Sequence, residues 1–314
     1  MAAFRTAGRG TLFALLAAVA CRGAVRAELA PAQDAGAAAV DAGVRMHADA
    51  RPSYDRDADL AQRRAAAREE LGDRTVFDVE DGVFLLAAAR PSPVFDAGVN
   101  LVRQALPAYF HDRFARHPDR AVTVFLFEAA APYTASCTRH MGMTCPAEFG
   151  VYIREKREIL ANLGPGVTTL SHEIVHPIVQ TDFPDAPAWL DEGIGALFEA
   201  PVFPSPGEVH GAANWRLARL KAALRSSRES PAVRLDALFA TPDDTFRGEA
   251  QSLHYAMARY ACQWLDERGW LWPFYRAWRD GILDDVHGEK AFRDATGMSP
   301  EEANGPWRAW AGKL

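Results

Sequence analysis

Apolar segments of strand length are concentrated in the first half of the chain. They occupy residues 76–79, 83–86, 121–127, 149–153 and 158–163. Glu80-Asp81-Gly82 separates the first two segments and is typical of a hairpin turn. The segment 121–127 is apolar almost throughout, which predicts a strand in the middle of a sheet. The charged residues 154–157 separate the last two segments, so we expect these two strands to pair across a turn.

Helical patterns occur between and after these segments. They cover residues 57–71, 94–117, 170–179, 192–199, 214–224, 235–239 and 253–265. Pro107 is expected to kink the second of these helices or to begin a new piece. Trp215, Leu217, Leu220 and Leu224 form an apolar stripe, which we expect to pack in the core. Strands followed by a mainly helical part predict an α+β fold, with a small sheet and a helical C-terminal part.

The helix predicted around residues 170–179 carries the motif His172-Glu173-Ile174-Val175-His176. Imidazoles at positions i and i+4 lie about 40° apart around a helix and one turn apart along it, so both can reach one metal ion. Glu173 is then placed to act as a general base beside that ion. Two histidines and a glutamate would be costly inside an apolar helix without such partners. The pattern therefore predicts a metal site, to which two histidines contribute only part of the ligands.

A second motif, Trp189-Leu190-Asp191-Glu192-Gly193, supplies a candidate third ligand. The segment 180–187 contains two prolines and two aspartates, which favours a turn that folds the next helix back on the first. That return would aim Glu192 at the two histidines. Two imidazoles and one carboxylate favour zinc over other divalent ions.

With both motifs in view, residues 168–199 resemble the gluzincin metallopeptidases, including uncharacterised bacterial branches of that clan. In these enzymes the second motif reads roughly Trp-Leu-Asn-Glu-Gly, and its glutamate is the third zinc ligand. The resemblance implies one zinc ion per chain, held by His172, His176 and Glu192, with Glu173 as the general base. It also implies a thermolysin-like core, in which a small twisted sheet lies beside the active-site helix.

The same resemblance implies two further features. A tyrosine or histidine from a later helix stabilises the oxyanion, and Tyr255 is our candidate, with His254 as the alternative. An edge strand within residues 150–163 receives the substrate backbone by strand addition. The motif Gly-x-Met-Glu-Asn, with which zinc aminopeptidases bind the substrate amino terminus, is absent from the sequence, which disfavours an aminopeptidase.

The sequence departs from the gluzincin pattern at two positions. Pro177 directly follows the second histidine and removes one helix hydrogen bond, so it either re-aims His176 or marks a site that has lost its activity. Ala196 stands where thermolysin-like enzymes have an aspartate one turn after the third ligand. The carboxylate that orients a histidine must then come from elsewhere, and Asp191 and Glu199 are the candidates.

Composition narrows the functional classes. The chain of 314 residues has a formal net charge of −6. This charge balance gives no indication of the basic surface that nucleic-acid binding requires, so no nucleic-acid partner is expected. Cys137 and Cys145 flank a short glycine-containing loop and are predicted to form a disulfide in an exported protein. Cys262 is then left as a buried thiol.

The N-terminus predicts export. A short basic region precedes an apolar run at residues 12–20, which has the length of a secretory signal and is too short to span a bilayer. Cleavage after Ala27 would remove a signal peptide, residues 1–27. Alternatively, Ala18-Val19-Ala20-Cys21 resembles a bacterial lipobox, which would give a signal of residues 1–20 and a lipid anchor on Cys21. We therefore expect a periplasmic or cell-envelope protein, attached to the membrane in the second case, or a secreted one.

These features divide the mature chain into two regions. Residues 28–70 are rich in alanine and aspartate and predict a flexible tether that ends in a short helix. Residues 71–314 are expected to form the catalytic domain, with an α/β part at 71–165 and a helical part at 166–314.

The sequence thus predicts an exported zinc metallopeptidase that hydrolyses peptide bonds of a peptide or protein substrate through a zinc-activated water. Two alternatives remain open at this point. One is a catalytically inactive relative that serves as a binding protein of the cell envelope. The other is a zinc amidase that acts on peptidoglycan.

Overall fold

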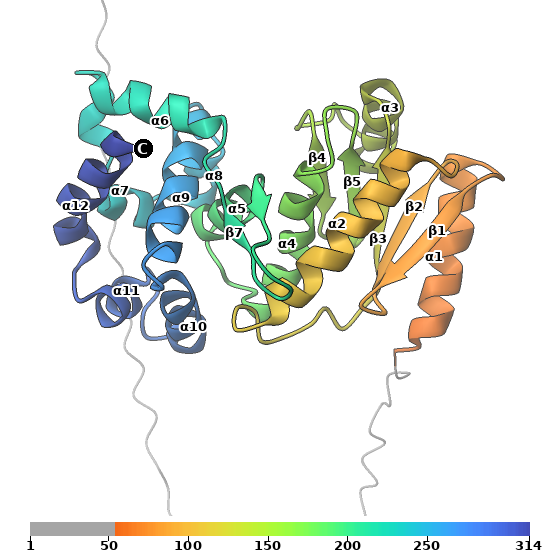
Figure 1. The fold of residues 1–314 in the computed structure, drawn as a ribbon, viewed down its shortest axis with the longest axis horizontal. Coiled ribbons are helices and arrows are strands. Elements are labelled where there is room, and N and C mark those ends of the chain that lie inside the picture. Colours follow the sequence, from red (N-terminus) through yellow and green to blue (C-terminus); the bar gives the residue numbers. More distant parts are fainter. Residues whose placement is uncertain (1–53) are drawn as a thin grey trace, which may run out of the picture. The chain divides into compact units, whose positions relative to one another are not determined.

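The five predicted strands form one mixed sheet (Figure 1). The computed structural model describes residues 54–314, so the predicted signal peptide, Cys21 and most of the tether lie outside the described residues. The strands are β1 (Val76–Glu80), β2 (Phe84–Ala88), β3 (Val122–Phe127), β4 (Gly150–Ile153) and β5 (Glu158–Asn162). Their order in the sheet is β1-β2-β3-β5-β4, which places β3 at the centre as predicted. Strands β2, β3 and β5 are parallel, and the edge strands β1 and β4 pair antiparallel with their neighbours.

Both predicted tight connections are present. Asp81 and Gly82 join β1 to β2 with φ values of 52° and 67°. A type I′ hairpin turn requires positive φ at both central residues, which explains why an Asp-Gly pair occurs here. The charged residues 154–157 join β4 to β5, as predicted from the sequence.

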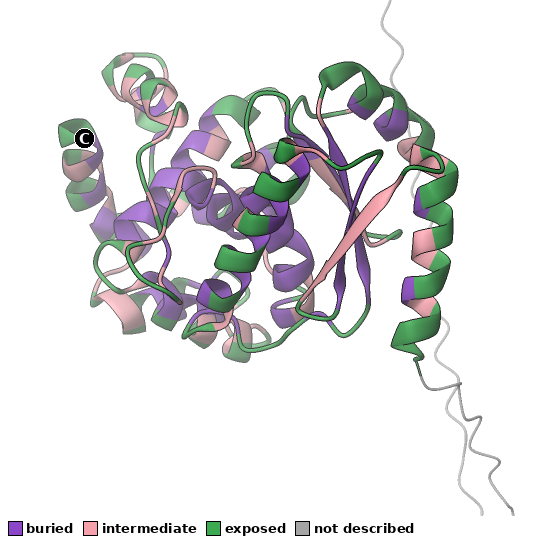
Figure 2. Cartoon of the chain, turned by 45° about the vertical axis from the view of Figure 1, so that its right-hand side comes forward, coloured by how far each residue is buried: buried purple, intermediate pink, exposed green. Residues whose placement is uncertain are grey.

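Helices cover both faces of the sheet. Helix α2 (Pro93–Phe110) and helix α4 (Thr169–Asp182) pack on one face, and α1 (Arg56–Leu71) and α3 (Ala130–Met141) pack on the other. Alternate residues of each central strand therefore enter different cores, as strand geometry requires. In β3, Val124 joins the core under α2 and α4, whereas Phe125 joins the core under α3. Figure 2 shows the resulting burial of the central strands and the partial exposure of the edge strand β1.

Two predictions for this part of the chain need correction. The helix predicted to reach residue 117 ends at Phe110, and Asp112 has a positive φ of 63° that a helix cannot contain. Pro107 lies inside α2 without ending it. Helix α3 was not predicted, and a disulfide joins its Cys137 to Cys145 in the following loop. That bridge agrees with the predicted pairing.

The rest of the described chain is mainly helical, and the α+β fold class is confirmed. Its helices are α5 (Ala188–Leu197), α6 (Arg216–Arg225), α7 (Leu235–Phe239), α8 (Asp243–Phe246), α9 (Gln251–Asp266), α10 (Leu271–Gly281), α11 (Glu289–Thr296) and α12 (Pro300–Lys313), with a 3-10 turn at Ser230–Ala232. Two short strands, β6 (Pro201–Val202) and β7 (His210–Gly211), pair antiparallel between α5 and α6. Within residues 54–314, no helix combines the length and apolarity needed to cross a membrane.

Aromatic rings hold this helical part together. Trp189 of α5 packs on Phe239 with 4.5 Å between ring centroids, and Phe274 and Trp278 of α10 complete the cluster. Burial of these large side chains removes much apolar surface from water, and each contributes about 2–3 kcal/mol. Trp215 is an exception to the predicted core stripe, because 65% of its surface is exposed.

Candidate metal centre

Helix α4 presents both motif histidines from a buried position. Leu170, Ile174 and Ile178 on this helix are fully buried in the core against the sheet. His172 and His176 are also largely buried, with 7% and 9% of their surfaces exposed, and both line a cavity of about 490 Å³. The apolar residues of α4 thus anchor the helix, and its i and i+4 imidazoles face the cavity.

The predicted return of the chain brings Glu192 to the two histidines. Helix α5 packs against α4, and Oε2 of Glu192 lies 3.4 Å from Nε2 of His172 and 3.9 Å from Nε2 of His176. One ligand atom from each of the three residues lies within 4.8 Å of the others, an arrangement that could hold a metal ion. Gly195 makes room for this approach, because a Cβ atom there would lie 3.0 Å from Nε2 of His172.

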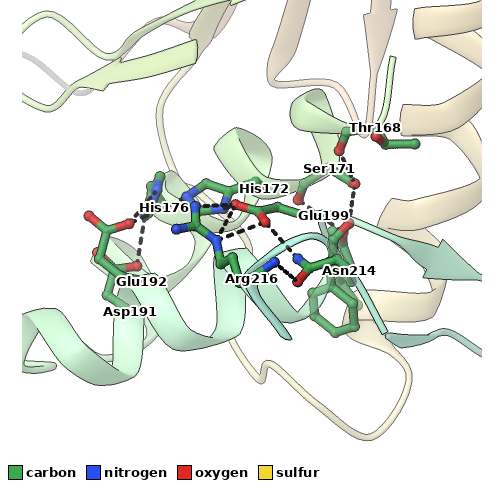
Figure 3. Close-up of polar contacts among 11 residues, drawn as sticks. Thr168, Ser171, His172, His176, Asp191, Glu192, Glu199, Asn214 and Arg216 are labelled. Carbon is green, nitrogen blue, oxygen red and sulfur yellow. Dashed lines mark hydrogen bonds and ion pairs between the residues drawn. The ribbon is translucent and has the colours of Figure 1, made fainter. Parts of the chain in front are cut away.

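Carboxylates contact the opposite nitrogen of each imidazole (Figure 3). Nδ1 of His176 donates a hydrogen bond to Asp191 at 2.9 Å, and Nδ1 of His172 lies 3.3 Å from Oε1 of Glu199. The second contact has ion-pair distance but lacks the alignment of a good hydrogen bond. Such partners orient a metal-binding imidazole and leave its Nε2 free for the metal. Both candidates for this role, Asp191 and Glu199, therefore lie where the role requires.

Glu199 is itself held by two residues that sequence reasoning did not identify. Arg216 donates to both carboxylate oxygens, with Nη2 2.6 Å from Oε1 and Nε 3.0 Å from Oε2. Asn214 donates its amide to Oε2 at 2.7 Å. Asn214 and Arg216 lie 15 and 17 positions after Glu199, and the chain between them and Glu199 contains the β6–β7 pair. Because these contacts depend on that tertiary arrangement, no local sequence pattern marks them.

The electrostatics of the metal-free site follow from burial and from these contacts. Burial disfavours a charged His176, but the Asp191 carboxylate outweighs burial and raises the pKa of His176 to about 9. The pKa of His172 is raised well above its usual value, because its contacts with Glu192 and Glu199 also outweigh burial. Burial raises the pKa of Glu199, but its contacts with His172 and Arg216 outweigh burial and lower that pKa to about 2. Without a metal, the carboxylates thus favour the imidazolium form of both histidines.

Glu173 faces the same cavity between the ligands and the sheet. Burial raises the pKa of Glu173 above its usual value. Gly150 at the start of β4 is in close contact with this carboxylate, because a Cβ atom at Gly150 would lie 2.6 Å from Oε1 of Glu173. The carboxylate is therefore confined between α4 and β4, and its position depends on a glycine in the strand.

The edge strand β4 forms one wall of the cavity, which is lined there by Phe149, Gly150, Val151 and Tyr152. Because β4 is an edge strand that pairs with β5, its other edge is available to an added strand. Tyr152 links this wall to α4 through a hydrogen bond from its hydroxyl to Gln180 at 2.5 Å.

The opposite wall comes from the helical part. Arg216, Arg247, Gln251 and Tyr255 line it. Burial raises the pKa of Tyr255, and the negative charge of Glu192 adds to that effect. His254 instead binds the Phe246 carbonyl through Nδ1 at 3.0 Å. Of the two candidates for oxyanion binding, the structure thus brings Tyr255 to the metal ligands.

Pro177 does not interrupt the site. Helix α4 runs from Thr169 to Asp182 with the proline inside it, and Thr181 donates a hydrogen bond to the Pro177 carbonyl one turn later.

Helix α5 packs closely against α9, because a Cβ atom at Gly193 would lie 2.8 Å from Sγ of Cys262 in α9. Cys262 is a buried free thiol, as predicted.

Residues 166–269 match a protein family described as "Protein of unknown function (DUF1570)". The matched segment begins just before α4 and ends just after α9. It contains the three candidate ligands, Glu173 and Tyr255, but none of the strands of the five-stranded sheet. No curated protein matches the sequence.

Proposed function

We propose that this chain is an exported zinc-dependent peptidase of the gluzincin type. The observation that carries the proposal is the convergence of Nε2 of His172, Nε2 of His176 and Oε2 of Glu192 on one point of a cavity. Two histidines and one glutamate form a typical ligand set of a catalytic zinc peptidase, and they leave a coordination position free. The edge strand β4 on the opposite side of this cavity supports a peptide as the substrate.

The residues of the site fit zinc in a further respect. The two imidazoles have carboxylates at Nδ1, which raise the basicity of the ring and fix its orientation. When bound, zinc supplies a Lewis acid and lowers the pKa of a water molecule toward about 7.

The chain's own residues supply the remaining chemistry. Glu173 accepts a proton from the attacking water and delivers it to the leaving amine, a task that suits a buried carboxylate with a raised pKa. Tyr255, on the helical wall, donates a hydrogen bond to the oxyanion. Strand β4 binds the substrate backbone and presents the scissile bond beside Glu173.

Export rests on independent observations. The sequence begins with a basic and apolar segment of signal length. Within the described residues, the disulfide between Cys137 and Cys145 supports an oxidising compartment. We propose the periplasm or cell envelope as the location.

The test is cleavage of a mixed peptide library by the zinc-loaded protein, with Glu173→Gln beside it. We expect the wild-type protein to cleave, and the variant to retain zinc but to lose at least about 10²-fold in rate, the lower end of the range for a general base. Glu155→Gln removes the same charge at an exposed position, so it serves as the control and should cleave normally. If both proteins hold zinc and neither cleaves peptides, the peptidase proposal fails. Cleavage of peptidoglycan fragments by the wild-type protein alone would then identify an amidase.

A further inference from the structure

The two walls of the cavity differ in chemistry. The β4 wall offers backbone groups and the apolar or aromatic side chains of Phe149, Val151 and Tyr152. The helical wall offers hydrogen-bond donors, with two guanidinium groups, an amide and a phenol. A peptide that pairs with β4 therefore has a donor-rich surface on its other side, and that surface favours acceptor groups on the substrate.

Arg216 is not available to a substrate. Three of its N–H···O contacts, between 2.6 and 3.2 Å, go to the two oxygens of Glu199. Its guanidinium also lies between two aromatic rings, 4.2 Å from the centroid of Trp215 and 4.9 Å from that of Tyr255. Only 13% of the side chain is exposed. Arg216 is a fixed part of the wall that positions Glu199.

Arg247 is available. Its side chain is 47% exposed, and its one carboxylate contact in the described part of the chain is from Nη2 to Oε1 of Glu192 at 3.2 Å. The histidines contact the other oxygen of Glu192, Oε2. Arg247 therefore leaves the metal-facing oxygen free. Since a guanidinium carries five N–H groups, most of those on Arg247 remain without a carboxylate acceptor.

The position of Arg247 indicates where its ligand lies. Glu192 is a metal-ligand candidate, so a group bound by Arg247 is next to the reacting bond. Planar guanidinium groups bind carboxylates through two parallel hydrogen bonds, which gives both affinity and orientation. A divalent cation bound to Glu192 would share its single negative charge. That charge would then neutralise the Arg247 guanidinium only in part.

We propose that Arg247 binds a carboxylate of the substrate close to the scissile bond, so that the preferred substrates are acidic peptides. The inference rests on the proposed peptidase function and adds a substrate class to it. The carboxylate has two sources, which are an acidic side chain beside the scissile bond and the free C-terminus of a short substrate. Both present the same group to Arg247.

The experiment measures binding to the variant Glu173→Gln, in which we expect cleavage to be strongly reduced, so that the result does not depend on cleavage. Three peptides share one sequence. The first has a central Gln and an amidated C-terminus, the second replaces that Gln with Glu, and the third keeps the Gln but has a free C-terminus. Affinities are measured by calorimetry with excess zinc, and bound zinc is quantified for each protein. We expect at least one acidic peptide to bind about tenfold or more tightly than the neutral peptide, and the stronger of the two identifies the source of the carboxylate.

The variant Arg247→Gln, added to Glu173→Gln, should abolish this preference, and Arg247→Lys should keep part of it. Arg225→Gln is the matched control, because Arg225 is exposed on α6 and lies outside the cavity lining. Arg154→Gln tests the other exposed arginine of the cavity, which has no ion-pair partner among residues 54–314.

Equal binding of the three peptides would overturn the proposal. So would no binding by any of them, a preference that survives Arg247→Gln, or a preference that disappears only in Arg154→Gln. Cleavage by the wild-type protein separates this proposal from the peptidase function. Selective binding without cleavage would contradict the peptidase function and leave the role of Arg247 intact. Cleavage without a preference for acidic peptides would support the peptidase function and contradict the role of Arg247.

Discussion

Oδ1 of Asp191 accepts a hydrogen bond from Nδ1 of His176 at 2.9 Å, and Asp191 directly precedes Glu192 in the chain. One turn of α5 therefore supplies both a candidate metal ligand and the carboxylate that orients another ligand. Glu199, beyond the end of α5, places its carboxylate at ion-pair distance from Nδ1 of His172, 3.3 Å away. The candidate metal centre is thus built from α4, which supplies the two histidines, and from α5 with its C-terminal extension, which supply Glu192 and both carboxylates at Nδ1.

Asp191→Asn tests the orienting role. The substitution keeps the shape of the side chain but removes its charge, so we expect zinc affinity to fall by about 10–100-fold. A competition titration against a chelator measures the change. Asp185→Asn, an exposed change in the α4–α5 connector, should leave the affinity unchanged. Equal zinc affinities for the two variants would contradict a role for Asp191.

Gly150→Ala tests the confinement of Glu173. The new Cβ atom would lie 2.6 Å from Oε1 of Glu173, so the carboxylate has to move. A displacement of about 1 Å at the reacting group costs on the order of 10²-fold in rate, and we expect that loss with zinc content unchanged. Gly281→Ala is the control, because a Cβ atom there meets no atom within 4 Å. Full peptidase activity in Gly150→Ala would show that Glu173 does not act from its observed position.

Zinc binding should release protons. In the metal-free protein the pKa of His176 is raised to about 9, and the pKa of His172 is also raised. A raised pKa favours the protonated imidazole near neutral pH, whereas zinc binds only the neutral form. We expect zinc binding at pH 7 to release protons, and zinc affinity to rise as the pH is raised toward about 9, the pKa of His176.

Calorimetry at pH 7 in two buffers of different ionisation enthalpy measures this proton release. Asp191→Asn removes the charge that raises the pKa of His176, so it should reduce the number of protons released. A binding enthalpy that does not depend on the buffer would contradict the charge state described for the metal-free site.

The disulfide should stabilise the strand that borders the site. Cys145 leads into residues 146–149, where Tyr133 donates a hydrogen bond to the Ala147 carbonyl at 2.9 Å and Asn162 donates one to the Glu148 carbonyl at 3.2 Å. We expect Cys145→Ser to lower the free energy of unfolding by about 2–3 kcal/mol.

Urea denaturation with and without reductant measures the effect of the disulfide. The wild-type protein should lose the same stability on reduction, and Cys145→Ser should be insensitive to reductant. Thiol titration shows whether the bridge is open. If the bridge is open and the wild-type stability is unchanged, the prediction is contradicted.

Features that depend on neighbouring residues could be predicted from the sequence. The Asp81-Gly82 turn and the i, i+4 pair of His172 and His176 need only local geometry, and both are present. Glu192 could be placed because a turn-rich connector follows α4 and a known motif follows the connector.

The remaining contacts of the site depend on tertiary packing. Arg247 reaches Glu192 across 55 positions, and Arg216 reaches Glu199 across 17, so no periodicity marks either pair. The apolar stripe of α6 places Trp215 in the core, but this residue precedes the first turn of the helix and is exposed to solvent beside Arg216. Pattern alone does not show where a helix stops packing.

The most direct test of the account is the zinc content of the purified protein, compared with that of Glu192→Ala and of the exposed control Glu155→Ala. We predict one zinc ion per chain in the wild-type protein and in the control, because His172, His176 and Glu192 together form the site. Glu192→Ala should retain little zinc after dialysis against a weak chelator. Stoichiometric zinc in Glu192→Ala, or none in the folded wild-type protein supplied with zinc, would contradict the proposed metal centre.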